Sequence, residues 1–253
     1  MRFLRTIALA CAAPLLLAQA APTLVPDVSQ RDIDIVYSFT GAELLLFGAI
    51  LYPGGRVPDD RADIVVVVKG PVQSVLMREK AKVAGIWVNA DEARFRSAPS
   101  FYAIASSRPI DTLVDERTRA IYELGLGSLQ LSPITTGGAE LQARFAAGLV
   151  DLRKRSGLFT ESADTVEITD DVLYRARIDI PARVPVGRFT AETFLIRDGR
   201  VLAAATRDIE IRKSGFERFV AYAADHWSVL YGLTAVALSL ALGWAAGALF
   251  RRT

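Results

Sequence analysis

The stretch Tyr174-Arg175-Ala176-Arg177-Ile178-Asp179-Ile180 decides the fold class of this chain. Apolar and charged or small side chains alternate along it, and a period of two is typical of a β-strand with one buried and one solvated face. Pro181 follows and interrupts the pattern. Further on, two apolar runs flank Arg197-Asp198-Gly199-Arg200, whose Asp-Gly pair is a strong hairpin signal. This part of the chain is therefore predicted to form antiparallel strands.

Strand patterns also fill the sequence upstream. Ile33 and Ile35 alternate with Asp32 and Asp34, and residues 64–68 are an unbroken β-branched run, as expected of a strand buried on both faces. Other strands are expected at residues 44–51, 83–88, 101–106, 189–196, 201–205 and 209–211. Short strands separated by turn signals are typical of β-sandwiches. The sequence thus predicts a mainly β fold, an immunoglobulin-like β-sandwich.

Two amphipathic helices are expected as insertions between the strand blocks. The first begins near Asp111 as its cap and would bury Val114, Ile121 and Leu124. The second covers about residues 139–156, before Gly157, and its apolar residues recur at helical spacing: Leu141, Phe145, Leu149 and Leu152.

The second helix also carries a basic face. Arg144, Arg153, Lys154 and Arg155 lie opposite its apolar residues. Such a face is either simply solvated or a contact for anionic lipid or an acidic partner. We expect residues 21–220 to form one β-rich domain, with a division near residues 157–165 as the alternative.

Two aromatic residues, Trp87 and Tyr102, lie within predicted strands. A tryptophan in a strand is usually a core residue, and this is the favoured interpretation of Trp87. In the alternative, Trp87, Tyr102 and the basic helix face line a ligand pocket or form part of a partner surface.

The first 20 residues have the pattern of a signal peptide. Arg2 and Arg5 precede a short apolar run, and Ala18-Gln19-Ala20 places small residues at a cleavage point. The run is too short to span a bilayer comfortably. An uncleaved anchor is the alternative, and a lipoprotein site at Cys11 is less favoured because its surroundings are a poor lipobox.

Residues 227–250 form a second apolar segment, without a charged side chain and long enough to cross a bilayer as a helix. A three-residue cytoplasmic tail, 251–253, is expected to follow. Together with the leader, this places the domain in the periplasm and the anchor in the inner membrane. The expected membrane-interface residues are Trp227, Tyr231, Trp244, Arg251 and Arg252.

Small residues recur every four positions inside this segment: Ala235, Ser239, Gly243 and Gly247. Gly243 and Gly247 form a GxxxG pattern, which lets another helix approach closely. The stripe predicts self-association or packing against an integral membrane protein. In the alternative, the small residues have no packing role and only reflect a genome whose composition favours alanine and glycine.

The sequence argues against most catalytic chemistry. The chain has one cysteine, Cys11 in the leader, and one histidine, His226 at the edge of the membrane segment. Cys-ligated metal, disulfides, thiolate catalysis and a Ser-His-Asp triad are therefore not expected. With a net charge of +2 and no long basic run, nucleic-acid binding is not expected either. We predict no catalytic, cofactor or metal site; calcium at an acidic turn is the weaker alternative.

Several short sequence segments, taken together, resemble the putative transmembrane protein family of Alphaproteobacteria. They are Ser38-Phe39-Thr40-Gly41-Ala42, Phe47-Gly48-Ala49, Val68-Lys69-Gly70-Pro71, Lys82-Val83-Ala84-Gly85-Ile86-Trp87-Val88-Asn89, Pro99-Ser100-Phe101-Tyr102-Ala103, Tyr231-Gly232-Leu233 and Gly243-Trp244. The resemblance implies an exported region followed by one anchor, and an association with sulfite-exporter-type permeases. It carries over no catalytic residue.

Three roles follow from these features. The leading hypothesis is a single-pass, membrane-anchored periplasmic interaction module that contacts an integral membrane protein, such as a permease. The second is a membrane-tethered domain that binds a small ligand or ion. The third is an enzyme without histidine or cysteine in its site, which is the least favoured.

Overall fold

The computed structural model describes residues 21–35, 41–58, 60–135, 137–213 and 216–250. The predicted leader, residues 1–20, and the tail with Arg251 and Arg252 lie outside them. Contacts divide the chain into two units, residues 1–33 with 40–211 and residues 34–39 with 212–253.

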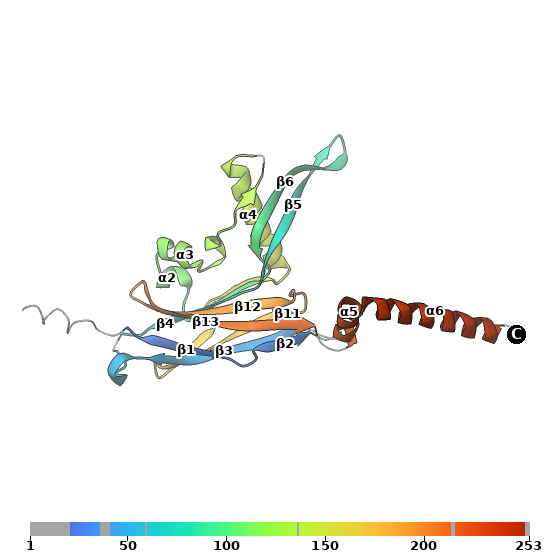
Figure 1. Cartoon of the computed structure of the whole chain (residues 1–253). Helices are drawn as coiled ribbons and strands as arrows, with labels where there is room; N and C mark the ends of the chain where they lie inside the picture. Colours follow the sequence, from blue (N-terminus) through green and yellow to red (C-terminus); the bar gives the residue numbers. More distant parts are fainter. Residues whose placement is uncertain (1–20, 36–40, 59, 136, 214–215, 251–253) are drawn as a thin grey trace, which may run out of the picture. The chain divides into compact units, whose positions relative to one another are not determined.

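Three β-sheets dominate the first unit (Figure 1). The four-stranded sheet has the order β1 (Thr23–Val28), β3 (Gly41–Leu51), β11 (Leu173–Pro181) and β10 (Val166–Thr169). The six-stranded sheet has the order β2 (Asp32–Ile35), β13 (Arg200–Lys213), β12 (Gly187–Arg197), β4 (Asp63–Lys69), β7 (Tyr102–Ser106) and β9 (Phe159–Ser162). The three-stranded sheet has the order β5 (Val72–Val83), β6 (Ile86–Pro99) and β8 (Pro133–Ile134).

The core lies between the two larger sheets. Strand β4 is buried from Asp63 to Val68, as expected of a central β-branched strand. Strand β11 alternates exposed and buried residues along its length, which confirms the period-two pattern. Strands β1, β10 and β11 contact β12, β4 and β7 across the two sheets. The mainly β prediction is confirmed.

Hydrogen-bonding registers join these strands. Neighbouring strands in the four-stranded sheet are antiparallel, as are β4–β7, β4–β12 and β12–β13. Strand β9 pairs with β7 in parallel, so the chain after Gly157 returns to the same sheet. The predicted hairpin at Asp198 and Gly199 is present, because Arg197 pairs with Arg200 and both turn residues have positive φ. The two strands predicted at 201–205 and 209–211 form one continuous strand, β13.

The first predicted helix is broken into two short ones, α2 (Ile110–Leu113) and α3 (Glu116–Tyr122). Val114 is extended between them. The predicted cap at Asp111 is wrong, because Asp115 accepts the capping hydrogen bond from the backbone N–H of Thr118 at 2.8 Å. Ile121 is exposed, not buried. A short turn of 3₁₀ helix, η3 (Leu126–Ser128), follows, and another, η2 (Pro53–Gly55), follows β3.

The second predicted helix is confirmed as α4 (Ala139–Arg155). Phe145 and Leu149 are buried, whereas Leu152 is exposed. Gly157 has φ +71°. Its N–H donates to the Lys154 carbonyl at 2.9 Å, and the N–H of Leu158 donates to the Arg153 carbonyl at 3.0 Å. This is a Schellman ending, which needs a residue with positive φ and so favours glycine.

The second unit contains α5 (Phe216–His226) and α6 (Ser228–Phe250). Among the described residues, one helix is long and apolar enough to cross a membrane, over Ser228–Gly247 with a mean hydropathy of 1.8. The C-terminal membrane helix predicted from sequence is thereby confirmed. It begins one residue later than expected, since Trp227 lies between α5 and α6.

Candidate interaction surface

The hairpin of β5 and β6, which we call the arm, is anchored at its base by α4. The cluster between them contains buried residues of β6 and α4: Ala93, Phe95, Ala98, Phe145 and Leu149. Side chains of Val75, Met77 and Leu141 pack around it. Figure 1 shows α4 and the arm side by side, apart from the two larger sheets. The base of the arm therefore has a core of its own, and α4 is the element that completes it.

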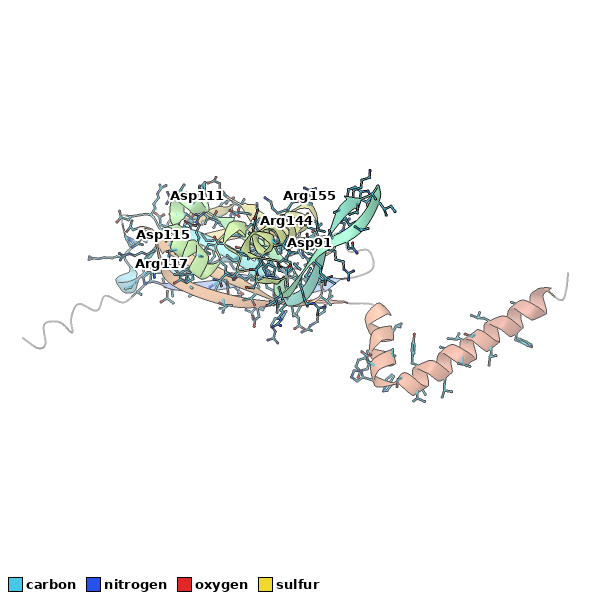
Figure 2. The ribbon with its side chains drawn as sticks, turned by 90° about the horizontal axis from the view of Figure 1, so that it is seen from above. Asp91, Asp111, Asp115, Arg117, Arg144 and Arg155 are labelled. Carbon is cyan, nitrogen blue, oxygen red and sulfur yellow. The ribbon has the colours of Figure 1, made fainter. Side chains whose placement is uncertain are left out.

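An arginine of α4 holds both strands of the arm at one level. Arg144 donates to Glu79 of β5 at 2.7 Å and lies 3.5 Å from Asp91 of β6. Figure 2 shows Arg144 and Asp91 next to each other. Glu79 and Asp91 are also direct cross-strand partners. This pairing, the Arg144 clamp, marks the end of the packed part of the arm.

The arm continues past the clamp as a tip without a core. Every residue from Lys82 to Ala90 is exposed. At about 3.3 Å per residue, the four residues from Lys80 to Val83 extend β5 by about 13 Å. The large apolar side chains of the tip have exposed fractions of 57% for Val83, 68% for Ile86, 66% for Trp87 and 40% for Val88. The prediction that Trp87 lies in the core is wrong.

The tip turns through two residues, Ala84 and Gly85. Val83 pairs with Ile86, so the loop has two residues, and both have positive φ, 48° and 86°. This is the signature of a type I′ turn, whose twist matches that of the flanking strands. The strand predicted at residues 83–88 is therefore two strands joined by a turn. The missed signal was Ala84-Gly85, which is a weaker turn pair than Asn-Gly.

The three-stranded sheet has one covered face and one open face. Ala93 and Phe95 of β6 are buried toward α4, whereas the intervening Arg94 is exposed on the other side. Arg94 pairs with Leu76 of β5 and with Ile134 of β8. All three residues are exposed, and they form a row across the sheet. We call this row, Leu76-Arg94-Ile134, the open face.

Tyr102 lies away from the arm tip, inside the six-stranded sheet. It is fully buried; its hydroxyl donates to the Glu123 carbonyl at 2.7 Å and accepts from the Gly125 N–H at 3.0 Å. Burial raises the pKa of Tyr102 above its ordinary value. The alternative in which Tyr102 and Trp87 share a pocket or surface is wrong, because Tyr102 is buried and Trp87 is exposed on the tip.

A half-buried ion cluster lies beside Tyr102. The Lys69 ammonium lies 2.9 Å from Glu123 and 3.2 Å from Glu192. Burial lowers the pKa of Lys69, but hydrogen bonds and the two carboxylates outweigh it, so the net shift is upward. Burial raises the pKa of Glu123, yet Lys69 and the Gln130 N–H lower it overall. Lys69 is paired with both carboxylates, so this cluster ties α3 to β4 and β12.

The remaining basic residues of α4 lie in its last turn, where they complement the negative end of the helix dipole. Arg155 pairs with Asp151 at 2.9 Å, one turn earlier. Arg153 is half-buried, and burial lowers the pKa of its guanidinium. Lys154 is exposed. The structure therefore divides the predicted basic face: Arg144 belongs to the arm, and the others belong to the helix end.

The helix α6 exposes its small-residue stripe. Ala235, Ser239, Gly243 and Gly247 are all exposed, and a side chain added at either glycine would meet no atom within 4 Å. The Ser239 hydroxyl donates to the Ala235 carbonyl at 2.9 Å, so this polar group is satisfied within the helix, as a bilayer requires. Trp227, Tyr231 and Trp244 are exposed as well.

A polar cleft of about 710 Å³ lies elsewhere in the first unit, lined by residues including Arg61, Asp63, Arg108 and Asp170. Asp63 is buried and accepts from Ser107 at 2.8 Å and from the Arg108 guanidinium. Its charge is satisfied within the chain. Among the described residues, no group of three or more His, Cys, Asp or Glu side chains could hold a metal ion.

Comparison with known proteins gives one family. No curated protein and no solved structure matches the chain. Residues 23–252 match the family described as "Putative transmembrane protein (Alph_Pro_TM)". The match covers the β-rich unit, the arm and α6 together. The chain therefore belongs to this transmembrane protein family.

Proposed function

We propose that this protein is a single-pass, membrane-anchored periplasmic interaction module without enzymatic activity. Its β-rich domain binds an integral membrane protein through the open face of the three-stranded sheet. The observation that carries the proposal is the asymmetry of that sheet: α4 fills one face with Phe145 and Leu149, while the other face presents Leu76, Arg94 and Ile134 to solvent.

The composition of the open face supports a protein contact. Leu76 and Ile134 are exposed apolar side chains on either side of Arg94. Arginine is enriched at protein interfaces because its guanidinium forms several hydrogen bonds while its stem packs against apolar groups. Glu92 lies next to Arg78 at 3.5 Å on the same hairpin, which adds polar groups of both signs at the rim.

The periplasmic placement rests on the sequence. A leader at residues 1–20 and an anchor at α6 leave the intervening domain outside the cytoplasm. The family match begins at residue 23, just after the expected cleavage point. The partner class, a sulfite-exporter-type permease, comes from the family resemblance alone. The stripe with Gly243 and Gly247 offers that partner a second contact inside the bilayer.

Photocrosslinking in living cells tests the proposal. A photoreactive amino acid is placed at Leu76 or at Ile134, and crosslinked proteins are identified by mass spectrometry. Leu173 on β11 is the matched control. It is also an exposed apolar strand residue, but it belongs to the four-stranded sheet, where it pairs with Ala49. We expect one integral membrane protein from Leu76 and Ile134 and none from Leu173.

Two further results complete this test. Leu76→Glu should remove the partner from detergent-solubilised complexes, whereas Leu173→Glu should retain it. Gly243→Leu with Gly247→Leu should weaken the complex if α6 also contacts the partner. The proposal is wrong if positions 76 and 134 capture no protein above the level seen at position 173.

A further inference from the structure

We propose that the arm tip is a second membrane-binding site, which inserts its apolar side chains into the interfacial layer of a bilayer that contains anionic lipid. This goes beyond the proposed function, because it concerns lipid and not the partner protein. It shares with that function only the anchoring of the domain by α6.

The first observation is that the tip is apolar on both faces of the hairpin. Ile86, Trp87 and Val88 are consecutive, so their side chains point alternately to opposite faces of the ribbon. All three are exposed. A protein that bound one face would leave apolar groups of the other face in water. A bilayer surrounds an inserted hairpin and covers both faces at once.

The second observation is the charge of the tip. Glu79 and Asp91, the carboxylates nearest the tip on each strand, are both paired with Arg144, which offsets part of their negative charge at the clamp. From Lys80 to Ala90, the arm carries two charged residues, Lys80 and Lys82, and both are basic. Their positive charge complements a surface of anionic headgroups.

The third observation is the arrangement of these groups. Lys82 lies directly opposite Trp87 across the hairpin, and Lys80 lies opposite Asn89. Tryptophan prefers the membrane–water interface, where its apolar ring is buried and its N–H stays hydrated. Lysine extends its ammonium toward the headgroups while its stem remains in the apolar layer. The tip thus presents its apolar turn first and its lysines just behind it.

The tether allows this contact. Only residues 214–227 separate the end of β13 from the start of α6. Even a fully extended chain of that length spans only about 50 Å. The end of β13 therefore stays within this distance of the bilayer that α6 spans. Because the tip is already tethered, a weak affinity for lipid is sufficient to keep it docked.

Tryptophan fluorescence of the full-length protein tests the proposal. The chain has three tryptophans, and replacing two of them, Trp227→Phe and Trp244→Phe, leaves Trp87 as the single fluorescent indole. The protein is reconstituted in phosphatidylcholine vesicles, and in vesicles with equal parts of phosphatidylcholine and phosphatidylglycerol, each with brominated chains that quench inserted indoles. We expect Trp87 emission to shift to shorter wavelength and to be quenched, more strongly with phosphatidylglycerol.

Lys80→Glu with Lys82→Glu is the charge variant. One lysine near an anionic surface changes binding by about fivefold, so reversing both charges should lower the docked population by more than about tenfold in the anionic vesicles. Both lysines are exposed, so an unchanged melting temperature checks that the variant is folded. The matched control moves the tryptophan within the same Trp227→Phe, Trp244→Phe background: Trp87→Phe with Leu173→Trp, whose emission should remain unquenched in both lipids.

Three outcomes would overturn the proposal. The first is Trp87 unquenched in both lipids. The second is quenching that is the same with and without phosphatidylglycerol and unaffected by the lysine variant. The third is Trp87 emission that shifts to shorter wavelength without quenching by the brominated chains, which would place the indole against protein instead of lipid. The vesicles contain no partner protein. A negative result with them would therefore contradict lipid binding by the tip but would not affect the crosslinking test of the partner contact at Leu76.

Discussion

Arg144 and Glu79 lie 2.7 Å apart across the boundary between α4 and the arm, and the same guanidinium lies 3.5 Å from Asp91 on the opposite strand. One side chain therefore spans both strands of the hairpin where its packed base ends. The pair is substantially exposed, with side-chain fractions of 58% for Arg144 and 44% for each carboxylate. Its importance lies in local order and charge, because exposed ion pairs contribute little to global stability.

Arg144→Ala should loosen the arm without unfolding the domain. We expect the free energy of unfolding to fall by less than about 1 kcal/mol, because the ion pairs are solvated. Amide hydrogen exchange in residues 79–91 should accelerate, whereas exchange in β4 should not change. Arg155→Ala is the control, since Arg155 pairs with Asp151 within α4. Equal exchange in the arm of both variants would show that Arg144 does not order it.

Phe95→Ala should destabilise the domain strongly. Phe95 is 1% exposed in the cluster that joins the arm to α4. Removing a buried phenylalanine side chain costs about 3–5 kcal/mol, because it loses burial and leaves a cavity. Thermal unfolding of the purified protein measures the loss. An unchanged melting temperature would mean that the base of the arm is not packed as described.

Trp87→Ala should leave stability nearly unchanged. The side chain is 66% exposed, and surface substitutions usually change the free energy of unfolding by less than about 0.5 kcal/mol. The same thermal unfolding experiment checks this. A loss as large as that of Phe95→Ala would restore the core interpretation of Trp87 and contradict an exposed tip.

The elements that sequence predicts well are those with a strong, single signal. Strand β4 is an unbroken β-branched run, and β11 alternates over its whole length. Helix α4 has apolar residues at helical spacing and a glycine at its end, and α6 has a long apolar segment. In each case local preference and tertiary environment agree, so the pattern alone was sufficient.

The arm was not predicted because its sequence lacks such a signal. In β5 apolar and charged residues mix, since one face meets α4 only at the base and the tip has no core. The sequence favours a core position for Trp87 because tryptophan in a strand is usually buried, but burial depends on neighbouring elements that the sequence of one strand does not reveal. The open face was equally hidden, because Ile134 lies far from Leu76 and Arg94 in sequence.

Ala84→Asn should stabilise the arm tip. Ala84 has φ +48°, a conformation that asparagine adopts more readily than alanine, and Asn-Gly is the preferred type I′ pair. We expect a gain of about 0.5–1 kcal/mol in local opening free energy, measured by hydrogen exchange at Val83 and Ile86. Gly85→Ala should destabilise the tip. The added methyl group would meet no neighbouring atom, so the cost comes from the φ of +86°, which is unfavourable for alanine. Equal exchange in both variants would exclude this turn.

Protease accessibility should reveal the topology of the chain. Protease added to spheroplasts should digest the β-rich unit and leave a membrane fragment that contains α6. Alkaline carbonate should not extract the full-length protein, whereas a chain that ends at Trp227 should appear in the soluble periplasmic fraction. An intact domain in spheroplasts that digest a periplasmic marker would reverse the proposed orientation.

Glu123→Gln should reduce stability in a pH-dependent way. Burial raises the pKa of Glu123 but Lys69 and the Gln130 N–H lower it overall, so its stabilisation is present above the ordinary glutamate pKa of about 4.5. It is lost as the pH falls through the lowered pKa of the folded state. The pKa of Lys69 is raised, so its contribution persists below its ordinary value of 10.5 and is lost only at higher pH. Between these limits we expect a constant loss of about 1–2 kcal/mol.

Urea unfolding at several pH values measures this difference. The wild type and Glu123→Gln should converge only when the pH falls below the lowered pKa of Glu123 in the folded state, where its carboxyl is protonated in the folded and in the unfolded protein. Glu167→Gln is the control, because Glu167 pairs with Arg175 on the surface, with side-chain exposures of 56% and 55%. It should lose less than about 0.5 kcal/mol at any pH. If both variants gave the same small loss, the half-buried cluster of Lys69, Glu123 and Glu192 would not be what fixes α3 on the six-stranded sheet.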